Sequence, residues 1–169
     1  MARRLVTASR DDAAAIAALH TESWRSAYRG LVPDDFLGDS IVADRRRVWE
    51  ERMAVAADGD RLVLAAIEDE AMVGFTCVLR DADPAWGPLL DNLHVKPACK
   101  GRGIGRDLFT ASREWSAMVS PGQPMHLWVI EGNVEARRFY DRQQGEVVEC
   151  QLLELTPGIH VPSLRYVWR

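Results

Sequence analysis

The sequence predicts an α/β (α+β) fold in which a mixed, mostly antiparallel sheet of about seven strands carries about four helices on its faces. Short β-rich runs and segments of helical period alternate along the chain in the order β-α-α-β-β-β-α-β-α-β-β. Strands joined by a short polar turn should pair antiparallel. Strands separated by a helix should be parallel and joined by a right-handed crossover, which makes the sheet mixed.

The N-terminal half contains a first strand, two helices and a hairpin: strand 3–8, helix 11–28, helix 41–57, strand 62–67 and strand 72–79. Ser9, followed by Asp12, has the spacing of a helix N-terminal cap, and Gly30 and Pro33 separate the two helices. The polar turn at 68–70 is short enough to indicate a hairpin.

The C-terminal half repeats a strand and helix pattern and ends in a second hairpin: strand 89–95, helix 104–120, strand 125–130, helix 133–142, strand 147–155 and strand 159–168. Two prolines and a glycine predict a loop over 81–88. Pro121 ends the third helix, Asn133 caps the fourth, and the turn at 156–158 joins the last two strands.

Length and charge limit the possible functions. The 169 residues form one domain, 1–169, with no internal repeat, and the formal net charge of −4 argues against a general nucleic-acid binder. No apolar run approaches the roughly 20 residues of a membrane span, and the N-terminus lacks the apolar core of a signal peptide. We therefore expect a cytoplasmic protein that has no membrane partner.

The three cysteines favour neither a disulfide framework nor a metal centre. Cys77, Cys99 and Cys150 are odd in number and form no Cys-x-x-Cys pair. We expect them to be reduced and mostly structural, and we expect no metal site.

The stretch VKPACKGRGIGRDLF, residues 95–109, combines bare backbone with positive charge at the start of a predicted helix. It contains three alternate glycines and three basic residues: Gly101, Gly103, Gly105, Lys100, Arg102 and Arg106. Glycines let successive backbone N–H groups turn toward an anion, and the helix start adds partial positive charge, which suits a phosphate or pyrophosphate. No Gly-Lys-Ser/Thr follows, and the glycine spacing is wrong for a dinucleotide fold. The alternative is an ordinary glycine-rich turn leading into a helix.

Two segments together resemble a known family. The stretch from Leu93 to Gly105 resembles the acetyl-CoA pyrophosphate motif of the GNAT superfamily of acyl-CoA-dependent N-acyltransferases. The pattern Asn133-x-x-Ala136-x-x-Phe139-Tyr140 resembles the second motif of the same family, and the order of the predicted elements is also the family's. The resemblance implies a sheet that is splayed between its fourth and fifth strands.

Acetyl-CoA is the cofactor that this resemblance implies. The pyrophosphate would be bound through the backbone of the loop residues Lys100, Gly101, Arg102, Gly103, Ile104, Gly105 and Arg106. The strand-edge groups of Leu93, His94 and Val95 would pair with pantetheine, and Asn133 would hold the cofactor arm. Lys100 replaces the usual Gln or Arg, and Gln144-Gly145 stands where the family usually has Gly-Phe or Gly-Gly, so the end of the fourth helix is expected to differ.

The chemistry implied is direct attack of an amine on a thioester. Tyr140 would lie near the sulfur and protonate the leaving thiolate, or it would only pack the helix onto the sheet. The base is less defined, because the position of the family's glutamate holds Leu89. Asp91, the acid in the strand before the loop, would act through water, bind a cationic acceptor or be an ordinary strand-end acid; Glu22 and Glu131 are lesser alternatives.

The acceptor would be bound near the first helix, where His20, Trp24, Tyr28 and Arg29 occur, although Trp24 and Tyr28 could equally pack the helix onto the sheet. The sequence thus predicts an acetyl-CoA-dependent N-acetyltransferase acting on a primary amine of a small molecule. The alternatives are acetylation of a peptide or protein N-terminus, and a non-catalytic acetyl-CoA sensor.

Tyr166 and Trp168 in the last strand would form either a homodimer edge or part of the core.

Overall fold

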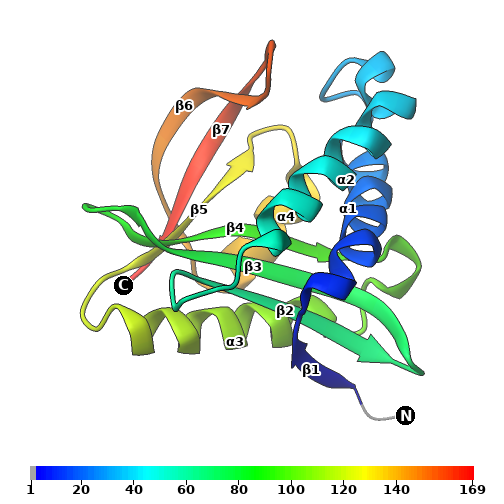
Figure 1. Cartoon of the computed structure of the whole chain (residues 1–169). Helices are drawn as coiled ribbons and strands as arrows, with labels where there is room; N and C mark the ends of the chain where they lie inside the picture. The colour runs from blue at the N-terminus through cyan, green and yellow to red at the C-terminus, as the bar shows by residue number, and fades with distance from the viewer. Residues whose placement is uncertain (1–2) are drawn as a thin grey trace.

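One seven-stranded sheet organises the protein. The computed structural model describes residues 3–169, and its strands follow the spatial order β1-β2-β3-β4-β5-β7-β6 (Figure 1). The strands are β1 Arg4–Thr7, β2 Arg61–Glu68, β3 Ala71–Asp83, β4 Gly87–Val95, β5 Met125–Ile130, β6 Glu146–Thr156 and β7 Ile159–Trp168. Among the strands of residues 3–169, only β4 and β5 pair in parallel, so the predicted mixed, mostly antiparallel sheet is confirmed.

Within the described part of the chain, four α-helices cover the sheet: α1 Ala13–Ala27, α2 Asp39–Ala54, α3 Ile104–Val119 and α4 Val134–Arg142. The helices α1 and α2 lie on one face, and α3 runs along the other (Figure 1). On the face covered by α1 and α2, Ile16 and Trp49 pack in one cluster with Phe75 of β3, and all three side chains are buried. The α3 side shares a second core cluster with α4 through Phe109 and Tyr140, so each face of the sheet has its own apolar core.

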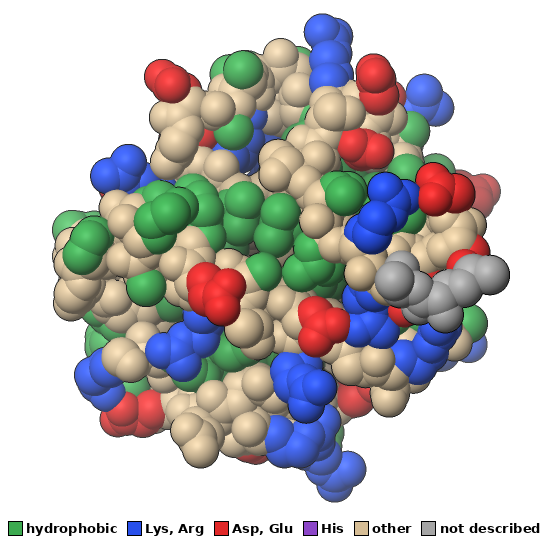
Figure 2. Space-filling view, turned by 90° about the horizontal axis from the view of Figure 1, so that it is seen from below, with side chains coloured by type: hydrophobic (Ala, Val, Ile, Leu, Met, Phe, Trp, Pro, Cys, Tyr) green, Lys and Arg blue, Asp and Glu red, His purple; other side chains and the backbone are tan. Residues whose placement is uncertain are grey.

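Basic and acidic side chains lie next to each other on the face that carries α3 and β1, with apolar groups between them (Figure 2). Arg3 and Arg102 both form ion pairs with Glu68 there, at 3.0 and 2.7 Å. These two arginines are therefore paired locally.

The two strand-helix-strand passages differ. The passage β4-α3-β5 joins neighbouring parallel strands, as predicted. The passage β5-α4-β6 also joins strands of the same direction, but β7 lies between them and pairs antiparallel with both. The edge strand is therefore β6, and the last strand β7 is internal. Tyr166 and Trp168 are 1% and 4% exposed, so both belong to the core and not to a sheet edge.

The predicted loop over 81–88 is wrong for most of its length. The strand β3 continues to Asp83 and β4 begins at Gly87, so the connection is the short turn 84–86. The Asp83 carboxylate closes this turn by accepting hydrogen bonds from the N–H groups of Ala85 and Trp86, at 2.9 and 3.1 Å. Pro88 lacks an N–H, and the ladder has no register pair between Leu79↔Leu89 and Asp83↔Gly87. The prolines interrupt the pairing without ending the hairpin.

No helix in the described part of the chain, residues 3–169, is both long enough and apolar enough to cross a membrane.

A buried histidine gives the fold a pH dependence. His126 of β5 is 2% exposed, and its Nδ1 lies 2.9 Å from an Nη of Arg165, so Nδ1 accepts from the guanidinium. Burial, followed by the Arg165 charge, lowers the pKa of His126 from 6.5 to about 4. The unfolded chain therefore binds a proton that the folded chain excludes between these values.

We predict that the free energy of unfolding falls as the pH drops from 6.5 toward about 4, where His126 becomes protonated in the folded state as well. One such histidine contributes a slope of at most about 1.4 kcal/mol per pH unit. Urea unfolding across this range should show a weaker pH dependence for His126→Gln, whose amide oxygen can still accept from Arg165. His160→Gln, at an exposed histidine of β7, is the control. Identical pH dependence of the wild type and His126→Gln would contradict the assignment.

Candidate active site

The sheet opens between its two parallel strands. A single register pair, Leu89↔His126, connects β4 to β5. The opposite edge of β4 stays paired with β3 as far as Val95. Beyond Leu89, the backbone groups on the β5 side of β4 therefore have no strand partner, and they form an open edge at residues 93–95. The splay implied for the fourth and fifth strands is present.

A cavity of about 840 Å³ fills this opening. It is lined by the C-terminal end of α1, β4, the loop before α3, the first turn of α3, the middle of β5 and one face of α4. Most of the site residues that the sequence predicts line it: Tyr28, Asp91, Leu93, His94, Val95, Lys100, Gly101, Arg102, Gly103, Ile104, Gly105, Arg106, Asn133 and Tyr140. Side chains far apart in the sequence thus surround one space.

The glycine loop has the backbone conformation that an anion cradle needs. Gly101 and Gly103 adopt φ values of +76° and +81°, in the left-handed region that other residues rarely occupy. Gly103 is also the N-cap residue of α3 and has no side chain to cap the helix. The N–H groups of the first helical turn therefore remain available at the cavity, together with the positive end of the helix dipole.

The basic side chains around the loop differ in what they contact. Lys100 forms an ion pair with Glu135 of α4, at 2.8 Å, and Arg102 pairs with Glu68. Within residues 3–169, Arg106 and Arg142 both line the cavity and neither forms an ion pair. These two guanidinium groups are free to meet an anionic ligand.

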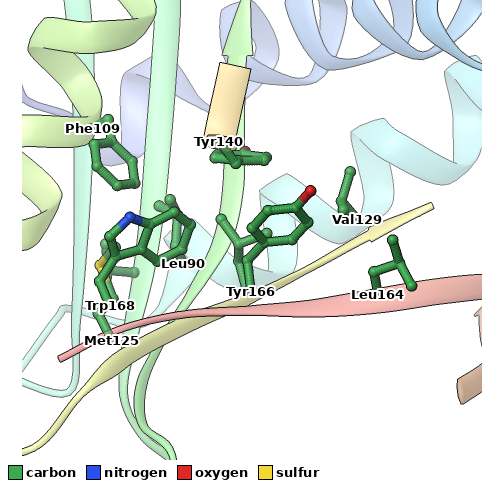
Figure 3. Packing of buried hydrophobic residues seen from close by; sticks show 10 residues of the cluster. Leu90, Phe109, Met125, Val129, Tyr140, Leu164, Tyr166 and Trp168 are labelled. Atoms are coloured by element: carbon green, nitrogen blue, oxygen red, sulfur yellow. The ribbon is translucent and has the colours of Figure 1, made fainter. Parts of the chain in front are cut away.

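Tyr140 lies between the cavity and the core. It is 8% exposed and packs with Phe109, Tyr166 and Trp168 in an aromatic cluster (Figure 3). The Phe139 ring also packs against it, at a centroid distance of 5.2 Å. Burial, followed by the neighbouring Tyr28, raises the pKa of the Tyr140 phenol above its ordinary value. The phenol therefore stays protonated at neutral pH, as a proton donor must. Packing and proton donation are compatible roles for this side chain.

The two ends of α4 account for the motif residue Asn133 and for Gln144-Gly145, where the sequence departs from the family pattern. The Asn133 side-chain oxygen accepts from the N–H of Ala136 at 3.2 Å, which confirms the cap and leaves its amide nitrogen free. After the helix, Gln144 takes the left-handed position with φ 63°. Gly145 is needed for space, because a Cβ there would lie 2.6 Å from the Trp168 ring. The glycine therefore stands at 145 and not at 144, because the close contact with Trp168 requires it and the left-handed turn at Gln144 does not.

Asp91 occupies a β-bulge. The register of β3 with β4 steps from Val78↔Leu90 to Cys77↔Asn92, so Asp91 is the extra residue. Its Oδ2 accepts from Arg52 of α2 at 2.7 Å and from the Asn92 amide at 2.6 Å. Asp91 is therefore part of an ion pair and also lines the cavity, with Oδ1 left for another donor.

The first helix contributes fewer cavity residues than its composition suggests. Tyr28 lines the cavity, and burial raises its pKa to about 12. Trp24, 5% exposed, does not line the cavity; its ring packs against His20 and Tyr28 at centroid distances of 4.9 and 5.2 Å. Trp24 therefore positions Tyr28 from the core side. His20 and Arg29 do not line the cavity either.

The other carboxylates considered as bases lie elsewhere. Glu22 and Glu131 are exposed and do not line the cavity. Leu89 occupies the bridge to β5 and also does not line it. Among the described residues, Asp91 and Glu135 are the carboxylates that reach the cavity, and Glu135 is paired with Lys100.

Some cavity residues were not predicted from the sequence: Ser23, Ala27, Trp128, Phe139 and Arg142. Trp128 is the most informative of them. Leu127 and Val129, its neighbours in β5, face the core cluster of α3 and α4, so alternation turns Trp128 to the other face of the sheet. In a strand that is apolar except for His126, this signal appears only when the covered face is known.

The fold and the site define the class of the protein: a mixed sheet opened between two parallel strands, with a glycine loop and helix start at the opening, is the arrangement of an acyl-CoA-dependent N-acyltransferase. The chain belongs to the acetyltransferase (GNAT) family, whose model matches residues 13–145. This confirms the family and the enzyme class predicted from the two motifs.

Individual proteins agree with this assignment. A probable N-acetyltransferase of Mycobacterium tuberculosis is 26% identical over 153 residues, which cover 89% of this chain and 84% of the relative. The structure of the Thermoplasma acidophilum PaiA N-acetyltransferase in complex with coenzyme A has a TM-score of 0.76 at 20% identity, covering 99% of this chain and 100% of that chain. YncA of Salmonella typhimurium, with its cofactor acetyl-CoA, has a TM-score of 0.69 at 16% identity, covering 100% and 94%. At these identities the two structures establish the fold.

We predict that Gly101→Ala weakens the binding of coenzyme A about tenfold, equivalent to about 1.4 kcal/mol, because a side chain at positive φ shifts the loop N–H groups. Isothermal titration calorimetry measures this. Gly122→Ala is a matched control, since Gly122 has φ +79° and, like Gly101, would have no atom within 4 Å of an added Cβ, but does not line the cavity. Both variants should lose about 1 kcal/mol of stability. Equal affinities of the two variants for coenzyme A would show that the loop does not bind it.

Proposed function

We propose that the protein transfers an acetyl group from acetyl-CoA to a primary amine of a small molecule, by direct attack of the amine within a ternary complex. One observation carries this proposal: the open strand edge at 93–95, the loop at 100–106 and the Tyr140 phenol line a single cavity. These are the parts that bind pantetheine, pyrophosphate and the leaving sulfur in such a reaction.

The residues present fit coenzyme A. The loop glycines and the uncapped start of α3 offer N–H donors, and Arg106 and Arg142 add charges without an ion-pair partner among residues 3–169. The open edge of β4 offers backbone groups to the two amides of pantetheine. Structures of the same fold hold coenzyme A or acetyl-CoA, which supports the same assignment here.

Asp91 and water around it would take the proton of the acceptor. Bound acetyl-CoA supplies the thioester whose carbonyl carbon accepts the amine. An amine of pKa about 10.4 is mostly protonated at pH 7, and its deprotonation costs about 4–5 kcal/mol. Asp91 lines the cavity with Oδ1 available, so it can orient the ammonium and receive its proton through water.

Tyr140 would supply a proton at the other end of the reaction. Tyr140 would donate its phenol proton to the leaving sulfur as the amide C–N bond forms and the C–S bond breaks, and solvent would reprotonate Tyr140. The raised pKa keeps the phenol protonated when this step begins. Starting from the ammonium form, the nitrogen loses two protons in all: the equivalent of one is gained by the thiol, and the other is released to solvent.

The alternatives differ in their response to acceptors. A thiol-release assay with a panel of small amines and short peptides distinguishes acetylation of small molecules from acetylation of a peptide N-terminus. Binding of acetyl-CoA without acceleration of thiol release by any acceptor would indicate a sensor. The availability of Tyr140 at the cavity favours turnover.

We predict that Tyr140→Phe lowers kcat by about 10²-fold, the lower end of the usual contribution of general acid catalysis. The affinity for acetyl-CoA should change little, because the ring and its packing remain. Steady-state kinetics and calorimetry measure the two quantities.

Tyr166→Phe is the control for this experiment. Tyr166 belongs to the same aromatic cluster and donates to Asp141 at 2.8 Å, but does not line the cavity. Its variant should lose stability and keep kcat. An unchanged kcat in Tyr140→Phe would remove Tyr140 from the mechanism.

A further inference from the structure

The cavity has a flat aromatic wall at Trp128, and the part of the ring turned away from the cavity is covered by another side chain. Trp128 of β5 lines the cavity, and its cross-strand partner is Arg165 of β7. The guanidinium carbon of Arg165 lies 4.3 Å from the centroid of the Trp128 ring. Arg165 is 7% exposed and does not line the cavity, so it covers the part of the indole that is turned away from the ligand space.

Arg165 is itself held on several sides. It forms ion pairs with Glu149 at 2.8 Å and Asp83 at 3.4 Å, and the Trp86 ring lies on it at 5.3 Å. Two carboxylates and two indoles thus hold one guanidinium, and Trp128 is positioned by a buried network. A wall that is already ordered costs little further entropy when a ligand packs on it.

The Arg165 guanidinium also affects which ligand groups bind well against the Trp128 ring. The face of an indole attracts cations because of its negative potential, and a guanidinium on one face already draws on that potential. A second cation against the same ring therefore gains less, whereas a neutral flat group retains dispersion and the hydrophobic gain. Trp128 suits the apolar body of an acceptor better than an ammonium group.

The carboxylates that line the cavity can bind only one ammonium group. Among residues 3–169, those that line it are Asp91 and Glu135, and Glu135 is engaged by Lys100. Asp91 has its Oδ2 occupied by Arg52 and Asn92, which leaves Oδ1 for one donor. The second and third ammonium groups of a polyamine would have no free carboxylate.

We propose that the acceptor is a primary monoamine with a flat aromatic body, bound with its ammonium at Asp91 and its ring against Trp128. This inference rests on the proposed function and adds the substrate class. It excludes linear polyamines as preferred acceptors.

Thiol-release kinetics of the full chain with saturating acetyl-CoA test this with 2-phenylethylamine, n-butylamine and spermidine. The expected kcat/KM is highest for 2-phenylethylamine, by about tenfold over n-butylamine, near the upper end of what an aromatic pair contributes. Trp128→Ala should raise KM for 2-phenylethylamine about tenfold more than it raises KM for n-butylamine, and Trp128→Phe should restore most of the preference. Equal or better use of spermidine, or an equal effect of Trp128→Ala on both monoamines, would overturn the proposal.

The variant Trp86→Ala is the matched control, because Trp86 contacts the same guanidinium and does not line the cavity. It should keep the preference for 2-phenylethylamine, and loss of that preference would count against a direct contact at Trp128.

Calorimetry of the same amines with the coenzyme A complex separates this inference from the proposed function. If no amine is acetylated, the proposed function fails, while tighter binding of 2-phenylethylamine that is lost in Trp128→Ala still supports the subsite. Equal binding of the three amines contradicts it.

Discussion

The structure depends on the divergence of β4 and β5 after one register pair, Leu89↔His126. Each strand is satisfied on its other edge, β4 by β3 and β5 by β7, so the sheet can open without losing its remaining ladders. The opening exposes backbone polar groups that have no strand partner and that water or a ligand can satisfy. The same opening brings the starts of α3 and α4 to one cavity.

The closed end of this opening is held by a buried cation. Arg165 of β7 contacts His126 of β5, Glu149 of β6 and Asp83 of β3, so one side chain connects strands on both sides of the divergence. A buried guanidinium is stable only when its partners remain in place, which makes the group rigid. Its contact with Trp128 extends that rigidity to the cavity wall.

The sequence predicts the local features of this protein well. Helices, turns and the glycine loop depend on period, capping residues and glycine, and these signals lie within a few residues of one another. The position of β7 between β5 and β6 depends on long-range pairing and has no local signal. The extension of the β3–β4 hairpin through 81–88 likewise depends on partners that the prolines conceal.

In the candidate site, too, the residues defined by local backbone features could be predicted from the sequence, and those that depend on long-range packing could not. Motif residues such as Gly103 and Asn133 are defined by backbone conformation and capping, so the structure brings them to the cavity. Trp24 lies in a helix of mixed polarity and Trp128 in a mostly apolar strand, and only the packing of each face decides that Trp24 is buried and Trp128 faces the cavity. The ion pair of Asp91 with Arg52 joins residues of β4 and α2, and no spacing in the sequence indicates it.

Hydrogen–deuterium exchange with and without coenzyme A tests the central claim, that the opening beside β4 and the start of α3 bind the cofactor. The amides at 93–95 and 101–106 should exchange more slowly when coenzyme A is present, because ligand atoms replace water at these N–H groups. Binding of coenzyme A with no protection in either segment, or with protection confined to another part of the chain, would contradict the claim.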